Sequence, residues 1–166
     1  MGVLIDGCPA GLPLMPAQFE EDLARRRGGQ QPGTTPRMEE DLPIIKSGVF
    51  NGKTTGAPLL IEFENKNTRS VDYEKQRAIP RPGHADFVAH QKFGGFEDYR
   101  GGGHFSGRLT LPLVAAGVVA KSNAKNVEIS ATLTEVAGVI AIEKGIEKAI
   151  AHQDSVGGID RKSTRL

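Results

Sequence analysis

The chain contains little of what marks several protein classes. It has 166 residues with one cysteine, Cys8, so no internal disulfide can form, and we expect a reducing compartment. Tryptophan is absent and aromatic residues make up 5%, which argues against a thick aromatic core. The longest apolar run, residues 111–120, is too short to span a bilayer. Lys and Arg number 21 against 20 for Asp and Glu, so bulk attraction to nucleic acid or membrane is not expected. We therefore expect a soluble, cytoplasmic protein.

Glycine and proline, in contrast, are plentiful, with 21 and 10 residues, which favours turns and shaped loops over long regular elements. The patterns of apolar residues predict strands over residues 3–5, 44–50, 59–63 and 127–133, and helices over residues 16–27, 110–121 and 142–152. Residues 159–166 show no pattern, and we expect a disordered end there. We find no linker between two domains.

The clearest local signal is Asn51-Gly52, which supplies the positive φ angles of a type I′ turn. It predicts a hairpin of residues 44–50 and 59–63, with Leu59, Ile61 and Phe63 on one face of the sheet. In the helix over 110–121, Val114, Gly117 and Val118 are expected to pack closely.

Two segments contain residues that could carry chemistry. Three glycines at 101–103 before a helix form a weak anion-binding signal, and taken alone they favour a flexible turn. The forked guanidinium group of Arg108, in the following segment, strengthens the anion-binding interpretation. His84 has three interpretations: a structural histidine paired with Asp86, a general acid or base, or a metal ligand together with Asp86, His90 and His104. The spacing of these residues matches no closed zinc site. Cys8 is expected to be a small buried residue rather than a nucleophile.

Several longer motifs occur in a fixed order along the chain. They are GCPAGLPL at 7–14, RRRGGQ at 25–30, TTPRME at 34–39, SGVFNGKTTGAP at 47–58, TRSVDY at 68–73 in part, RPGHAD at 81–86, DYRGGGHFSGR at 98–108, VAAG at 114–117 and DSVGG at 154–158. In order and spacing these motifs resemble the chorismate synthase family.

The resemblance implies an α+β fold in which antiparallel sheets are sandwiched with helices, and a cytoplasmic homotetramer. It also implies a lyase of the shikimate pathway, which serves aromatic amino acid biosynthesis. The family makes chorismate from 5-enolpyruvylshikimate 3-phosphate by 1,4-anti elimination of phosphate. It needs reduced FMN, with NADPH or a flavin reductase as the electron source, although no net redox change occurs.

Site residues follow from the same resemblance. Matching the family motifs position by position implies His84 as the catalytic, proton-handling residue beside the flavin. The implied substrate-binding residues, for a phosphorylated dicarboxylate, are Arg26, Arg37, Ser106 and Arg108. The implied FMN-binding residues are Arg81, His84, His104, Phe105 and Ser106. No metal is implied.

The chain also departs from the family pattern. The family's opening histidine motif and its second half, with the catalytic aspartate, have no counterpart here, and Pro32 stands where many members have a cation. We therefore expect a partial domain over residues 1–158, an unmatched tail over 159–166 and impaired activity of the isolated chain. The alternative is a non-catalytic remnant that binds phosphate ligands or associates with full-length subunits.

Overall fold

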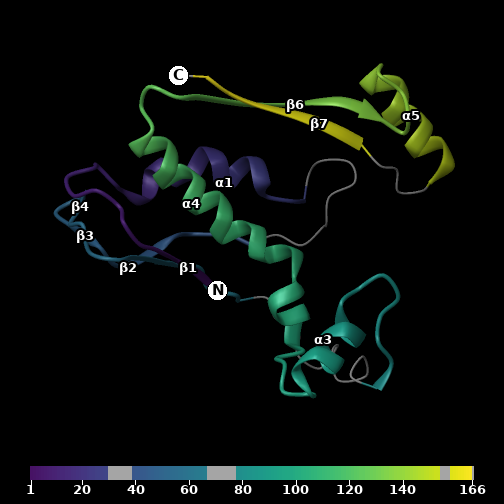
Figure 1. The fold of residues 1–166 in the computed structure, drawn as a ribbon, viewed down its shortest axis with the longest axis horizontal. Coiled ribbons are helices and arrows are strands. Elements are labelled where there is room, and N and C mark those ends of the chain that lie inside the picture. The colour runs from purple at the N-terminus through teal and green to yellow at the C-terminus, as the bar shows by residue number, and fades with distance from the viewer. Residues whose placement is uncertain (30–38, 67–77, 154–157, 166) are drawn as a thin grey trace. The chain divides into compact units, whose positions relative to one another are not determined.

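The computed structural model describes residues 1–29, 39–66, 78–153 and 158–165, and these residues form two compact units, 1–123 and 124–166. The first unit contains strands β1 (Gly2–Ile5), β2 (Ile44–Ser47), β3 (Val49–Phe50), β4 (Lys53–Thr54) and β5 (Leu59–Glu62), helices α1 (Glu20–Arg26), α3 (Asp86–Phe93) and α4 (Thr110–Asn123), and the 3-10 helices η1 (Pro16–Phe19), η2 (Arg100–Phe105) and η3 (Gly107–Leu109) (Figure 1). The second contains β6 (Glu128–Val136), α5 (Ile142–His152) and β7 (Gly158–Arg165).

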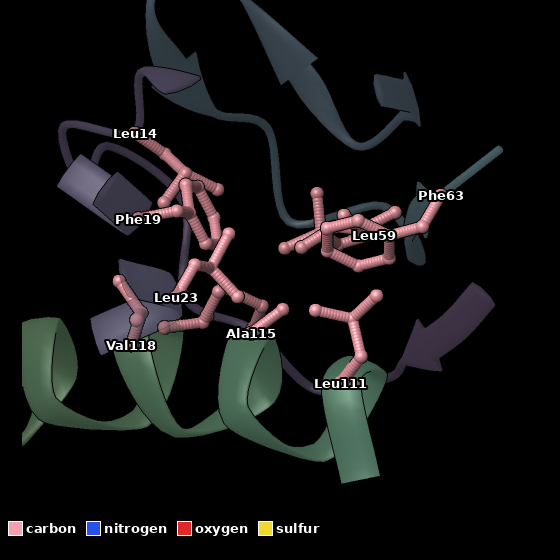
Figure 2. Close-up of a cluster of buried hydrophobic side chains, with 11 residues drawn as sticks. Leu14, Phe19, Leu23, Leu59, Phe63, Leu111, Ala115 and Val118 are labelled. Atoms are coloured by element: carbon pink, nitrogen blue, oxygen red, sulfur yellow. The ribbon is translucent and has the colours of Figure 1, made fainter. Parts of the chain in front are cut away.

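The core of the first unit lies between a sheet and two helices. The sheet has the antiparallel order β1-β5-β2, and α1 and α4 pack on each other, with α4 also contacting β1 and β5. Figure 2 shows Leu59 and Phe63 from the sheet side facing Leu23 of α1 and Leu111 and Ala115 of α4. Cys8 is buried in the same cluster, as expected for a small apolar residue. Helices over an antiparallel sheet make this an α+β fold, which confirms the predicted class.

The predicted type I′ turn is present, but it closes a shorter hairpin than expected. Asn51 and Gly52 have φ angles of 49° and 71° and join β3 to β4. The long run breaks at Gly48, whose φ is 82°; a Cβ there would lie 2.7 Å from the Leu59 Cα. The backbones approach so closely that only glycine fits. Beyond the break, β2 pairs with β5, and Leu59, Ile61 and Phe63 are buried as predicted.

The helix predictions hold with two differences. The segment over 16–27 begins with the 3-10 turn η1 and continues as α1, and α4 extends two residues beyond the predicted end at 121. Gly117 does not pack closely, since nothing lies within 4 Å of where its Cβ would be. Among the described residues, no helix combines the length and apolar character needed to cross a membrane.

The second unit corrects the expectation of a disordered end. β7 pairs antiparallel with β6 from Gly158 to Arg165, with one register shift between Leu133 and Glu135. Strand pairing through backbone hydrogen bonds needs no side-chain alternation, which is why the sequence pattern missed it. Helix α5 has the predicted bounds and packs on β6.

Candidate active site

Two arginines that are 82 positions apart in the chain meet beside the start of α4. Arg26 is the last residue of α1, and Arg108 lies in η3, directly before α4. The Arg26 guanidinium donates through Nε to the Thr110 hydroxyl at 3.2 Å and through Nη2 to the Arg108 carbonyl oxygen at 3.5 Å. The packing of α1 on α4 therefore brings together two residues that the sequence predicts to bind substrate.

A buried carboxylate holds both guanidinium groups. Asp41, whose side chain is 3% exposed, accepts from Arg108 Nη2 at 2.7 Å and lies 3.5 Å from Arg26 Nη1. Glu39 accepts from the same Arg108 nitrogen at 2.7 Å. The two positive charges are thus balanced by two negative ones, while the buried Arg108 Nε has no hydrogen-bond partner among the residues that the structure describes.

Sequence reasoning missed Asp41. It follows two glutamates in a polar stretch and belongs to no motif or period that would assign it a partner. Its φ of 53° is left-handed, which aspartate tolerates better than most residues. Only the fold shows that this carboxylate, rather than its neighbour Glu40, turns inward.

Ser106 positions Arg108 from the preceding loop. Its hydroxyl oxygen accepts from the Arg108 backbone N–H at 3.3 Å and thereby caps η3. A hydroxyl that accepts a hydrogen bond can also donate one, and among the described residues the Ser106 hydroxyl is recorded only as an acceptor. Ser106 thus lies next to the paired arginines, and its role in substrate binding stays a prediction.

The second cluster surrounds His84 in the turn before α3. Arg81 donates to both oxygens of Asp86, from Nε to Oδ2 at 2.7 Å and from Nη2 to Oδ1 at 2.7 Å. Its backbone N–H also donates to Oδ2, at 3.1 Å. The Nδ1 atom of His84 lies 2.6 Å from Asp86 Oδ1. The pairing of His84 with Asp86, one of its three sequence interpretations, is therefore observed.

Local backbone geometry creates this cluster. Gly83, with a φ of 73°, allows the chain to turn so that residues on both sides of it reach one carboxylate. Asp86 is the first residue of α3, where a negative charge is favourable. The hydrogen bonds from Arg81 hold the pKa of the Asp86 carboxyl well below its usual value.

The other predicted flavin-binding residues lie in or next to η2. His104 is exposed, and the half-exposed Phe105 ring lies 6.5 Å, centroid to centroid, from the ring of Phe93 at the end of α3. These two rings form an apolar surface accessible to a ligand. Arg37 and Pro32 lie outside the described residues. That Arg26, Arg37, Arg108 and His84 surround one ligand stays a prediction.

The histidines do not assemble a metal site. Within the described ranges, no three His, Cys, Asp or Glu side chains lie close enough together to hold a metal ion. His84 is paired with Asp86, whereas His90 lies 3.2 Å from Glu97. The described residues therefore do not support the interpretation of His84, Asp86, His90 and His104 as metal ligands.

A cavity of about 520 Å³ lies beside the acidic partners of Arg108. Its lining includes Glu39, Asp41, Arg27 and Lys66. The cavity thus reaches the carboxylates that balance the arginine pair.

Comparisons with known proteins agree with this fold. A family model described as chorismate synthase matches residues 1–164. The chain is 67% identical over 160 residues to a chorismate synthase of Chitinophaga pinensis, covering 96% of this chain and 48% of that relative. It is 50% identical over 141 residues to one of Lachnospira eligens, covering 84% of this chain and 38% of the relative.

A solved structure described as a crystal structure of chorismate synthase superimposes with a TM-score of 0.58 at 26% identity. It covers 86% of this chain and 36% of the solved one. The chain spans about half the length, or less, of the relatives it matches. The matched range, the identity and the shared fold show that this chain belongs to the chorismate synthase family.

Proposed function

We propose that this chain contributes the arginine pair and the flavin-side histidine to a site that forms chorismate from 5-enolpyruvylshikimate 3-phosphate. The observation that carries this proposal is the meeting of Arg26 and Arg108 at one end of the α1–α4 pair. A substrate with two carboxylates and a phosphate needs guanidinium groups fixed in place, because forked N–H donors match carboxylate and phosphate oxygens. The chain's membership of the family supports the choice of this substrate.

The reaction is a 1,4-anti elimination. A C–O bond to phosphate and a C–H bond break, a new C=C bond forms, and inorganic phosphate and a proton leave without net redox change. The arginine pair would hold the departing phosphate and the carboxylates. A ligand oxygen could compete with Glu39 for the Nη2 donor of Arg108.

The residues present are suited to a reduced flavin. The exposed rings of Phe93 and Phe105, tilted by 43° to each other, offer apolar contacts to a ligand ring, and the side chain of His84, 27% exposed, is accessible. When bound, reduced FMN supplies electron density to the breaking C–O bond. His84 would hold or move a proton beside it, a role suited to an imidazole near neutral pH. NADPH or a flavin reductase would supply the electrons that keep the FMN reduced.

Substrate binding tests the arginine pair. In calorimetric titration with 5-enolpyruvylshikimate 3-phosphate, Arg26→Ala and Arg108→Ala should each weaken binding by about 10- to 100-fold, the worth of a hydrogen bond between charged groups. The matched control is Arg25→Ala, because Arg25 neighbours Arg26 but is exposed and pairs with Asp22; its affinity should be unchanged. Equal affinities in all three variants would refute the arginine site.

Turnover is a separate measurement. We expect these 166 residues alone, which span about half of the related enzymes, to make chorismate slowly or not at all from substrate and reduced FMN without oxygen. A rate near that of the full-length relatives would overturn this expectation.

One observation favours the second candidate, association with further subunits without turnover. Apolar side chains on and near α3 are exposed, with Phe96 95% exposed and Phe87 and Val88 more than half exposed. A homotetramer, as in the family, would cover such surface. Gel filtration after incubation with FMN separates the candidates: retained flavin absorbance supports a cofactor site, whereas larger species without flavin support association alone.

A further inference from the structure

The carboxylate of Asp86 has a defined donor at each of its hydrogen-bonding positions. Its Oδ2 atom accepts the backbone N–H and the Nε–H of Arg81, and its Oδ1 atom accepts from Nη2 of Arg81. The remaining neighbour of Oδ1 is Nδ1 of His84, at 2.6 Å. Asp86 therefore does more than balance one charge, because it orients both a guanidinium and an imidazole.

This geometry determines which nitrogen of His84 carries the proton in the neutral ring. An ionised carboxylate only accepts hydrogen bonds, so the nitrogen facing it must be a donor. Nδ1 is therefore protonated, and Nε2 carries the lone pair. Arg81 Nη2 lies 3.3 Å from Nε2 and 3.1 Å from Nδ1. Because this cationic donor is near both ring nitrogens and also donates to Asp86 Oδ1, it does not distinguish them, and the 2.6 Å contact of Nδ1 with the carboxylate determines the tautomer.

We propose that Asp86 is a positioning residue that holds His84 as the Nδ1–H tautomer and so assigns its proton exchange to Nε2. The identity of the partner at Nε2, substrate or flavin, rests on the proposed function. The tautomer does not, because it follows from the contact of His84 Nδ1 with the Asp86 carboxylate.

The substitution Asp86→Asn would reverse this arrangement. Arg81 donates twice to Oδ2, so the amide oxygen of the substituted side chain would take that place and its NH₂ group would replace Oδ1. That NH₂ would lose the hydrogen bond that Oδ1 accepts from Arg81 Nη2, and it would face Nδ1 of His84, which would then have to accept. The neutral imidazole would change to the Nε2–H tautomer, as happens when the aspartate of a Ser-His-Asp triad becomes asparagine.

Nitrogen-15 NMR of labelled protein measures the tautomer directly. Spectra are recorded about two pH units above the usual histidine pKa of about 6.5, so that neutral rings are observed. The chain has four histidines, and the His84→Gln variant identifies the His84 signals. We expect an Nδ1–H ring in the unsubstituted protein and an Nε2–H ring in Asp86→Asn.

The matched control is Asp98→Asn. Asp98 accepts the same two-bond fork from Arg100, at 2.8 Å for each bond, and it is not a partner of His84. This variant should leave the His84 signals unchanged. A tautomer change in Asp98→Asn as well would show a general structural effect and would contradict the role of Asp86.

The unsubstituted protein is a test in itself, so the proposal does not depend on the folding of a variant. An Nε2–H ring there, or an unchanged tautomer in a folded Asp86→Asn, overturns the proposal. If the tautomer changes as expected while the arginine variants bind substrate normally, the proposed function fails and the role of Asp86 stands. In a catalytically active form, Asp86→Asn should lower kcat more than it raises KM, because the lost group acts through His84.

Discussion

At the residue scale, the ion pair between Asp86 and Arg81 predicts acid sensitivity. The pKa of Asp86 is lowered in the folded protein, chiefly by hydrogen bonds from the Arg81 side chain. Between the folded and unfolded pKa values, the unfolded state binds more protons, so folding stability falls as the pH falls. This contribution is complete above the usual aspartate pKa of about 3.9 and is lost as the pH drops through the folded value.

Urea unfolding of the unsubstituted protein and Asp86→Asn from about pH 6 down to about pH 3 measures that contribution. The difference in free energy of unfolding should be largest near pH 6 and should shrink below about pH 4. Asp98, whose pKa is lowered by Arg100, acts in the same direction but is present in both proteins, so the difference isolates Asp86. A difference that grows on acidification would contradict the assignment.

The two clusters were not equally predictable from sequence. His84, Asp86 and Arg81 lie within six positions, so a rigid turn brings them together and their pairing could be expected. The arginine pair was expected from family motifs, but its inward carboxylate Asp41 was not. The partners of Asp41 are 15 positions before it and 67 after it, and no local pattern encodes such a separation.

At the element scale, two helical glycines are expected to respond oppositely to alanine. A Cβ at Gly145 of α5 would lie 2.5 Å from the Val136 carbonyl oxygen and 2.8 Å from its Cβ. At Gly117 of α4 nothing lies within 4 Å. Alanine in a helix interior is favoured over glycine by about 0.5–1 kcal/mol unless its methyl group has no room.

Gly117→Ala should therefore raise the free energy of unfolding by about 0.5–1 kcal/mol. Gly145→Ala should weaken the packing of α5 on β6 by about 1–3 kcal/mol, the usual free-energy cost of overpacking. Amide hydrogen exchange in α4 and α5 measures the two effects separately. Slower exchange in α5 of the Gly145 variant would show that α5 does not pack closely on β6.

The strands show where sequence patterns succeed and fail. Leu59, Ile61 and Phe63 alternate and are all buried, because one face of β5 meets two helices. Apolar and polar residues also alternate along β6, yet its first six residues are all exposed. The alternation in β6 therefore does not correspond to one buried and one exposed face. β7 has no pattern but pairs through its backbone, and such pairing depends on a partner strand rather than on side-chain order.

At the scale of the whole molecule, the apolar core belongs to the first unit. Each member of the main buried cluster lies between Cys8 and Val119. In the second unit, Val136 is the buried apolar side chain among the described residues, whereas Ile146 and Ile150 of α5 are 46% and 64% exposed. Burial of apolar side chains is the main favourable contribution to folding, so the two units should differ strongly in intrinsic stability.

This difference predicts how the two units behave when separated. A polypeptide of residues 1–123 should unfold cooperatively in urea, because its buried cluster is complete. A polypeptide of residues 124–166 should show no cooperative transition, because a two-stranded hairpin with one helix buries too little apolar surface. Circular dichroism during urea titration measures both. A sharp transition in the 124–166 polypeptide, or none in the 1–123 polypeptide, would show that the buried cluster does not determine which unit is stable.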